Sequence, residues 1–339
     1  MANVTVVIPL YNKGPYILRA LSSVARQNYQ DWEAIVVNDG STDNSGQVAE
    51  SFRDPRVRVV HQKNAGPGAA RNHGIAETKT PLVAFLDADD EWLPEYLETA
   101  VRAFQQNPRL GCLTQGFFDE PGMRPSQAVW RGRGLHDGVQ AMQQQTPLSL
   151  HYLVAYMNSQ STVAQTEMVR KWGGFYEERC TYGEDSFLWL KFLLREQVAL
   201  SMRETMAIHR DASDLNFPGM KKARPIEPFL AHPEVLLEMC PPNLLPLLRG
   251  FFALRAFKTA CLFGYHGQWQ RAAEVRRQFR QPGDYRIPWY FSSWVCSTPI
   301  GAGVGTLWRG VNAIRSRSAQ KKSSTVSQKS GSDRLPAAR

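Results

Sequence analysis

Apolar runs alternate with helical patterns along residues 4–106, and this alternation most constrains the fold. The runs lie within residues 4–11, 32–43, 56–63 and 81–90. A near-continuous apolar strand indicates burial on both faces. Strands that alternate with helices form a mainly parallel sheet. We therefore predict an α/β fold, with a doubly wound, mainly parallel sheet flanked by helices and a helical C-terminal extension.

Two polar clusters follow these runs, at residues 38–43 and 87–90. In open α/β sheets, ligands bind beyond the carboxyl ends of the strands. Asp87, Asp89 and Asp90 fall within four positions, where like charges repel each other. Carboxylates suit Mg²⁺ or Mn²⁺, which favour oxygen ligands. A solvated turn or a helix cap is the alternative, but the preceding strand favours a cation site.

Three further groups allow both a structural and a functional interpretation. Asp39 is either part of an ordinary Asp-Gly-Ser-Thr turn or an acceptor of hydrogen bonds from a base or ribose. Arg71 is a surface residue of a Gly/Pro turn, or lies near a ligand's negative charge. Glu184 and Asp185 begin an amphipathic helix. They either cap this helix and interact favourably with its dipole, or one of them acts as a general base.

The chain resembles an inverting nucleotide-sugar glycosyltransferase of family two, with the GT-A fold. The resemblance rests on residues 7–45 with VIPLYNKGPY and VVNDGSTDNS, on NAGPGAARNHGI, AFLDADDEWLP and WGGF, and on GEDSFLWL. It covers about residues 3–212. These motifs occur in the family's order and spacing.

The resemblance implies a role for each matching position. Pro9 and Tyr11 line the nucleobase pocket, and Asp39 and Arg71 contact the base or ribose. Asp87 lies near the ribose and metal. The metal ligands are Asp89 and His209. Gly173 and Gly174 border the acceptor and donor sugar, Glu184 belongs to the nucleotide-sugar site, and Asp185 deprotonates the acceptor hydroxyl. Asn38 departs from the acid that many relatives carry there.

The C-terminal third lies outside the resemblance. We predict domains at 1–225 (glycosyltransferase), 226–282 (helical), 283–314 (apolar) and 315–339 (disordered, basic). Residues 287–308 carry no charge but contain Pro288, Pro299 and several glycines. This favours a membrane-surface or re-entrant element over a spanning helix. A segment packed against the catalytic domain is the alternative.

Charge and cysteine content exclude other classes. The tail at 315–339 holds seven basic residues and one acid, so it supplies +6 of the net +9. The rest is nearly neutral, which argues against nucleic-acid binding. Five cysteines, none close in sequence, argue against a disulfide framework and suggest a reducing compartment. The N-terminus lacks a secretory pattern, so we expect a cytoplasmic protein, peripheral on the inner face of the membrane.

The predicted function is metal-dependent transfer of a sugar from a nucleotide-sugar donor, UDP-linked by preference, to a hydroxyl of a glycan or lipid-linked acceptor. Mg²⁺ or Mn²⁺ on the diphosphate is the expected cofactor, and bacterial surface-polysaccharide assembly is the expected setting. Two alternatives stand beside it. One is a sugar-phosphate nucleotidyltransferase, although its basic Gly-rich phosphate loop is missing. The other is a non-catalytic nucleotide-sugar-binding protein, although Asp89 and Asp185 are both present.

Overall fold

The computed structural model describes residues 3–120, 124–178, 182–212, 225–279, 295–300 and 303. The chain divides into two compact units, residues 1–252 and 253–339. The predicted domain boundaries remain predictions. The apolar segment at 287–308 lies outside the described residues except at 295–300 and 303, and the basic tail lies wholly outside them.

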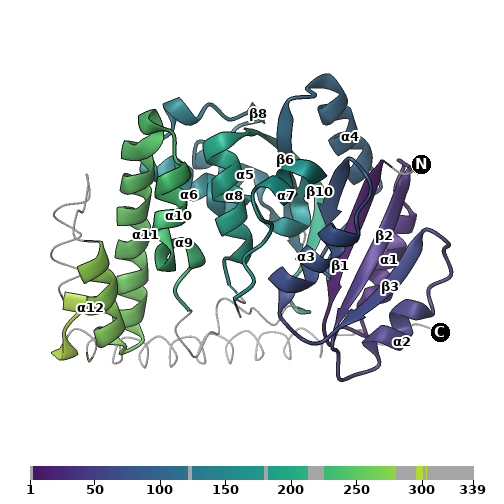
Figure 1. Ribbon diagram of the computed structural model, residues 1–339, viewed down its shortest axis with the longest axis horizontal. Helices are drawn as coiled ribbons and strands as arrows, with labels where there is room; N and C mark the ends of the chain where they lie inside the picture. Colours follow the sequence, from purple (N-terminus) through teal and green to yellow (C-terminus); the bar gives the residue numbers. More distant parts are fainter. Residues whose placement is uncertain are drawn as a thin grey trace, which may run out of the picture. The chain divides into compact units, whose positions relative to one another are not determined.

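In the described part of the first unit, ten strands pair into one sheet (Figure 1). They are β1 (Val4–Leu10), β2 (Trp32–Asp39), β3 (Val57–Gln62), β4 (Leu82–Phe85), β5 (Glu91–Trp92), β6 (Leu110–Glu120), β7 (Arg124–Pro125), β8 (Gly138–Val139), β9 (Thr162–Gln165) and β10 (Gln197–His209). The main order is β3-β2-β1-β4-β9-β6-β10-β5, with β7 beside β6 and β8 beside β10.

The predicted mainly parallel sheet is confirmed. Strands β3, β2, β1 and β4 are mutually parallel, and β6 is parallel to β10. The short β5, β7 and β8 and the inserted β9 pair antiparallel to their neighbours. The apolar runs are buried as expected: every residue of β4 is buried, as is all of β1 except Pro9.

Helices connect and cover the strands of the first unit. They are α1 (Ile17–Ala25), α2 (Ser45–Glu50), α3 (Pro67–Glu77), α4 (Tyr96–Gln106), α5 (Gln127–Gly132), α6 (Pro147–Tyr156), α7 (Thr166–Lys171), α8 (Glu184–Arg195), α9 (Pro228–Ala231) and α10 (Pro233–Met239). Short 3-10 helices occur at Met142–Gln144, Ser159–Ser161 and Pro242–Leu244.

Helix α3 packs directly on β1 and β2 (Figure 1). Gly74 allows this close approach, because a Cβ there would lie 2.3 Å from Cγ1 of Val7. At the other end of the helix, a Cβ on Gly68 would lie 2.2 Å from the carbonyl oxygen of Tyr176. These two glycines therefore fix α3, which carries Arg71, between the sheet and the segment that leads into α8.

Strand β6 extends beyond Gly116 to Glu120, along the second half of β10. The long-range pairing with β10 stabilises a stretch whose sequence carries a weak local signal.

The helical extension is confirmed for the described residues. Helix α11 (Leu245–Tyr265) crosses from the first unit into the second, and α12 (Trp269–Gln278) belongs to the second. Arg271 of α12 stacks over the ring of Phe263, with 4.1 Å from its Cζ to the ring centroid. No helix within the described ranges combines the length and apolar character needed to cross a bilayer.

Candidate active site

The carboxyl ends of β1 and β2 bring two predicted nucleotide contacts to one edge. Leu10 pairs with Asn38 in the parallel register, and Tyr11 and Asp39 directly follow this last pair. Tyr11 is 45% exposed. Asn12 has a positive φ of 51°, and its side-chain oxygen accepts a 2.8 Å hydrogen bond from the Thr42 backbone N–H. This bond ties the loop after β1 to the loop after β2.

Asp39 is 3% exposed and organises the loop before α3. Its carboxylate accepts hydrogen bonds from the backbone N–H groups of Ala65 and Gly66, both at 2.9 Å, and from the Gln62 side chain at 2.8 Å. The turn interpretation of Asp39 therefore holds in its geometry. The carboxylate oxygens keep further lone pairs that a ligand can use. The predicted contact with the nucleobase or ribose stays a prediction.

Arg71 joins segments that lie far apart in the sequence. Its guanidinium donates to Asp87 Oδ1 at 2.7 Å and to Glu184 Oε1 at 2.9 Å, and the residue is 4% exposed. Burial by itself would lower the pKa of Arg71, but Asp87, Glu184 and Asp185 raise it above its usual range. The Arg71 charge is therefore permanent, and it fixes the start of α8 against the end of β4. Phe175 lies beneath the guanidinium, at 5.3 Å from Cζ to the ring centroid.

Asp185 is placed at the first turn of α8, beside this cation. Its Oδ1 accepts a 2.7 Å hydrogen bond from the Ser186 backbone N–H. Burial, and then the charge of Glu184, raise the pKa of Asp185 to about 7, although Arg71 and the Ser186 N–H oppose the rise. The helix dipole alone would lower this pKa. Desolvation outweighs the dipole here, so the carboxyl titrates where a general base is most useful.

The three aspartates after β4 point to different partners. Asp89 forms an ion pair with Lys13, with 3.0 Å between Oδ2 and Nζ, and both side chains are 14% exposed. Asp90 is buried and accepts a 3.0 Å hydrogen bond from the His209 backbone N–H. Burial and neighbouring carboxylates raise the pKa of both Asp89 and Asp90. The cluster is therefore short of positive charge.

The side chains around the three aspartates bear on the predicted divalent cation site. The Nε2 atom of His209 is buried without a hydrogen bond, and a carboxylate oxygen of Glu91 lies 3.5 Å from it. Within the described ranges, no three His, Cys, Asp or Glu side chains are grouped to hold an ion. Mg²⁺ commonly takes one or two protein carboxylates together with substrate phosphates. The assignment of Asp89 and His209 as metal ligands stays a prediction.

The remaining predicted residues shape the backbone around the site. Gly173 and Gly174 have positive φ values of 79° and 67° and end α7, where their N–H groups donate to the Arg170 and Val169 carbonyls. A Cβ on Gly174 would lie 2.3 Å from Oδ1 of Asn72 on α3. Their predicted contact with the sugars stays a prediction. Pro9 is partly buried in β1, next to Tyr11.

Sequence reasoning missed several residues of this edge. Lys13 and Glu91 were not predicted, although Lys13 lies in the loop after β1 and Glu91 directly follows the acidic cluster, and position after a strand end is the signal that found Asp87. Phe175 carries no such signal, because only the tertiary structure places its ring beneath Arg71.

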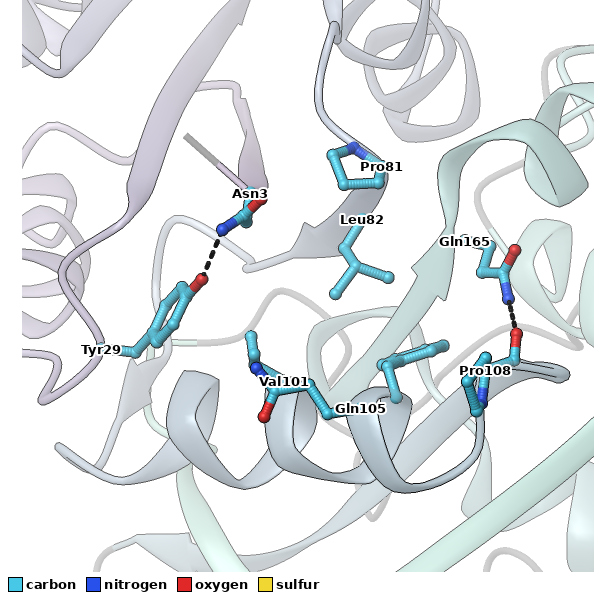
Figure 2. A pocket seen from close by; sticks show the side chains of 9 residues that line it. Asn3, Tyr29, Pro81, Leu82, Val101, Gln105, Pro108 and Gln165 are labelled. Atoms are coloured by element: carbon cyan, nitrogen blue, oxygen red, sulfur yellow. Dashed lines mark hydrogen bonds between the residues drawn. The ribbon is translucent and has the colours of Figure 1, made fainter. Parts of the chain in front are cut away.

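A separate pocket of about 310 Å³ opens at the opposite, amino edge of the sheet (Figure 2). Asn3, Pro81 and Leu82 line it from the strand starts, and Val101 and Phe104 line it from α4. None of the predicted site residues lines this pocket. The candidate active site is therefore identified by its charged side chains and by its place at the carboxyl ends of the strands, and not by this pocket.

Comparison with known proteins identifies the same N-terminal part of the chain as the strand-end motifs. Residues 5–161 match the family model described as Glycosyl transferase family 2. The uncharacterized glycosyltransferase EpsJ of Bacillus subtilis is 37% identical over 123 residues, which are 36% of this chain and 36% of EpsJ. Glycosyltransferase GlyG of Streptococcus pneumoniae is 41% identical over 106 residues, 30% of this chain and 35% of GlyG. The chain thus matches about a third of the length of these curated relatives.

Solved structures share the fold over a longer stretch. The crystal structure of S. aureus TarS 1–349 has a TM-score of 0.52 at 22% identity, covering 88% of this chain and 90% of that one. The mannosyltransferase PcManGT from Pyrobaculum calidifontis, in complex with GDP-Man and Mn²⁺, has a TM-score of 0.54 at 18% identity, covering 91% and 87%. The predicted GT-A fold is confirmed.

Proposed function

Because this chain belongs over residues 5–161 to glycosyl transferase family 2, we propose that it transfers a sugar from a nucleotide-sugar donor to an acceptor hydroxyl. The observation that carries the proposal is the Arg71 bridge between Asp87 and Glu184. This bridge holds Asp185, whose pKa lies near 7, beside the strand ends. A base of that pKa at a ligand-binding edge suits deprotonation of a hydroxyl.

The donor is proposed to lie across the ends of β1, β2 and β4. Tyr11 offers an exposed ring for stacking on the nucleobase. Asp39 and Arg71 then face the base or ribose, with Asp87 near the ribose. We propose a UDP-linked sugar. The choice is supported by a solved structure of similar fold, that of TarS in complex with UDP-GlcNAc.

The transfer step uses Asp185 as general base. The Asp185 carboxylate accepts the proton of the acceptor hydroxyl while the hydroxyl oxygen bonds to the anomeric carbon. The bond from that carbon to the diphosphate oxygen breaks on the opposite face, so the configuration inverts and the nucleoside diphosphate leaves. Glu184 remains paired with Arg71, so its role is to hold α8 and to raise the pKa of Asp185.

Asp89 and His209 are proposed to hold Mg²⁺ or Mn²⁺. When bound, the ion would act as a Lewis acid toward the negative charge of the leaving diphosphate. Asp90 supports this pair by accepting the His209 backbone N–H. The structure of PcManGT in complex with GDP-Man and Mn²⁺ gives parallel support for a divalent ion.

The acceptor is proposed to be a glycan or lipid-linked glycan of a bacterial surface polysaccharide. A membrane surface is the proposed partner of the second unit. Helix α12 places Arg276 and Arg277 in its last turn, and basic side chains beside anionic lipid each contribute about 1 kcal/mol to binding.

The test is to incubate the full chain with UDP-sugars and measure both products. Release of UDP with a glycosylated acceptor, stimulated by Mn²⁺, supports the proposal. Release of pyrophosphate would instead indicate a nucleotidyltransferase, and tight UDP-sugar binding without turnover would indicate a binding protein. Glu98→Gln is a matched control: Glu98 is an acid on α4 that pairs with Arg102 at 45% side-chain exposure, and its removal should leave turnover unchanged.

A further inference from the structure

Two cysteines that lie 35 positions apart in the sequence meet in the second unit. Cys261 belongs to α11, and Cys296 belongs to the described segment 295–300. The two thiols are near enough that each shifts the pKa of the other. Both residues are partly exposed, whereas Cys112 and Cys240 are buried. The pair is therefore both preassembled and open to small reagents.

The helix surface around Cys261 is shaped for this contact. Gly264 follows three positions later, on the same face of α11. A Cβ on Gly264 would lie 2.5 Å from the Cβ of Cys296 and 2.8 Å from its Cα. No side chain larger than hydrogen fits at that distance, so Gly264 lets the backbone at Cys296 lie directly on the helix. This packing places Cys296 one helical turn from Cys261.

The two thiols differ in reactivity. The hydrogen bond from Cys261 lowers the pKa of Cys296 to about 7, against the effect of burial. The same bond and burial raise the pKa of Cys261. Because the thiolate is the nucleophile, Cys296 is the first sulfur to react and Cys261 is placed to resolve the product. Burial raises the pKa of Cys112 and Cys240, so these two thiols are weaker competitors for an oxidant.

We propose that Cys261 and Cys296 are a redox modification site that closes to a disulfide when a peroxide is present. The Cys296 thiolate attacks the peroxide O–O bond, giving a sulfenic acid and hydroxide, which takes up a proton to form water. The Cys261 sulfur then attacks the sulfenic sulfur, releasing a second water and forming the S–S bond. Two thiols lose two electrons and two protons, and one hydrogen peroxide becomes two waters. A dithiol reductant reverses the reaction.

The consequence is a covalent link between α11 and segment 295–300 within the second unit. The proposed catalytic residues all lie in the first unit. The inference therefore does not depend on the proposed sugar transfer, and each can fail alone.

The test uses the reduced full chain, treated with graded hydrogen peroxide, then alkylated with N-ethylmaleimide and digested for mass spectrometry. We expect one cross-linked peptide joining Cys261 and Cys296, lost on treatment with dithiothreitol. Cys240→Ser is the matched control and should leave the cross-link intact. In Cys261→Ser, the sulfenic acid on Cys296 should persist and be trapped by dimedone.

Gly264→Ala tests the packing without removing a sulfur, and should lower the yield of the cross-link several-fold at equal peroxide. Full alkylation of both cysteines after peroxide treatment would overturn the proposal. So would a cross-link from Cys296 to another cysteine, or a dimedone adduct on Cys261 in place of Cys296. The melting temperature of each variant, measured in reductant, separates these outcomes from unfolding.

Discussion

Replacing Asp185 with asparagine should lower activity and raise stability at the same time. Asparagine keeps the shape and the acceptor oxygen for the Ser186 N–H but has no ionisable proton. General-base catalysis contributes about 10²- to 10⁴-fold in rate, so Asp185→Asn should reduce turnover by that order. Affinity for UDP should hardly change, because the base faces the acceptor.

The stability gain follows from the raised pKa of Asp185. The pKa rises from an ordinary value of 3.8 to about 7 in the folded chain. Between these values the unfolded chain has released the proton and the folded chain has kept it. Stability is therefore lost as pH rises through this window. Three pKa units correspond to ~4 kcal/mol, an upper limit because Glu184 shares the interaction. Asp185→Asn should thus melt several degrees above the wild type at pH 8, with a smaller difference at pH 5.

The pH dependence of turnover provides a second readout. Only the ionised carboxylate accepts a proton, so wild-type kcat/KM should rise about tenfold per pH unit below pH 7 and level off above it. Since Glu184 raises the pKa of Asp185, Glu184→Gln should move this midpoint to lower pH while retaining more activity than Asp185→Asn.

The assays are steady-state turnover, UDP calorimetry and thermal melting of both variants between pH 5 and pH 8. The capping interpretation predicts mild effects, because Asn also caps helices well. Full turnover in Asp185→Asn would remove Asp185 from the mechanism. A loss of turnover accompanied by a lower melting temperature at pH 8 would refute the argument from the buried charge.

Three further residues and one segment give separate predictions. Asp89→Asn should keep the fold but sharply lower Mn²⁺-dependent transfer, and near wild-type turnover at limiting Mn²⁺ would contradict the metal role. Tyr11→Ala should weaken UDP binding roughly tenfold, since base–aromatic stacking contributes about 1–3 kcal/mol; equal affinity in calorimetry would exclude stacking. Arg71→Met should cost about 3–5 kcal/mol of unfolding free energy by leaving two partly buried carboxylates unpaired, measured by urea unfolding. Removing residues 283–339 should shift the protein from membrane to soluble fractions, and a full-length chain that is soluble without detergent would count against anchoring.

The sequence by itself determined the sheet and the edge where the site lies. Apolar runs such as residues 4–11 and 81–86 predict buried parallel strands because burial on both faces demands apolar side chains at every position. The carboxyl ends of those strands then locate Asp39, Asp87 and Asp89 without any coordinates. The resemblance to family two glycosyltransferases selected Asp185 over Glu184 as the base and added His209 as a metal ligand.

Only the tertiary structure decided how these residues are paired. Arg71 and Glu184 are 113 positions apart and meet because Gly68 and Gly74 let α3 approach its neighbours closely. The pKa of Asp185 follows from burial and from Glu184, whereas the local signal of a helix N-terminus points the other way.

The same limit applied to β6 and to the cysteines. The second half of β6 forms because β10 lies beside it, and no local pattern encodes that partner. The widely spaced cysteines argue against a disulfide framework, yet Gly264 lets Cys296 pack against the helix that carries Cys261. Sequence periodicity reports the environment of each element, whereas contacts between distant elements depend on how closely their backbones approach.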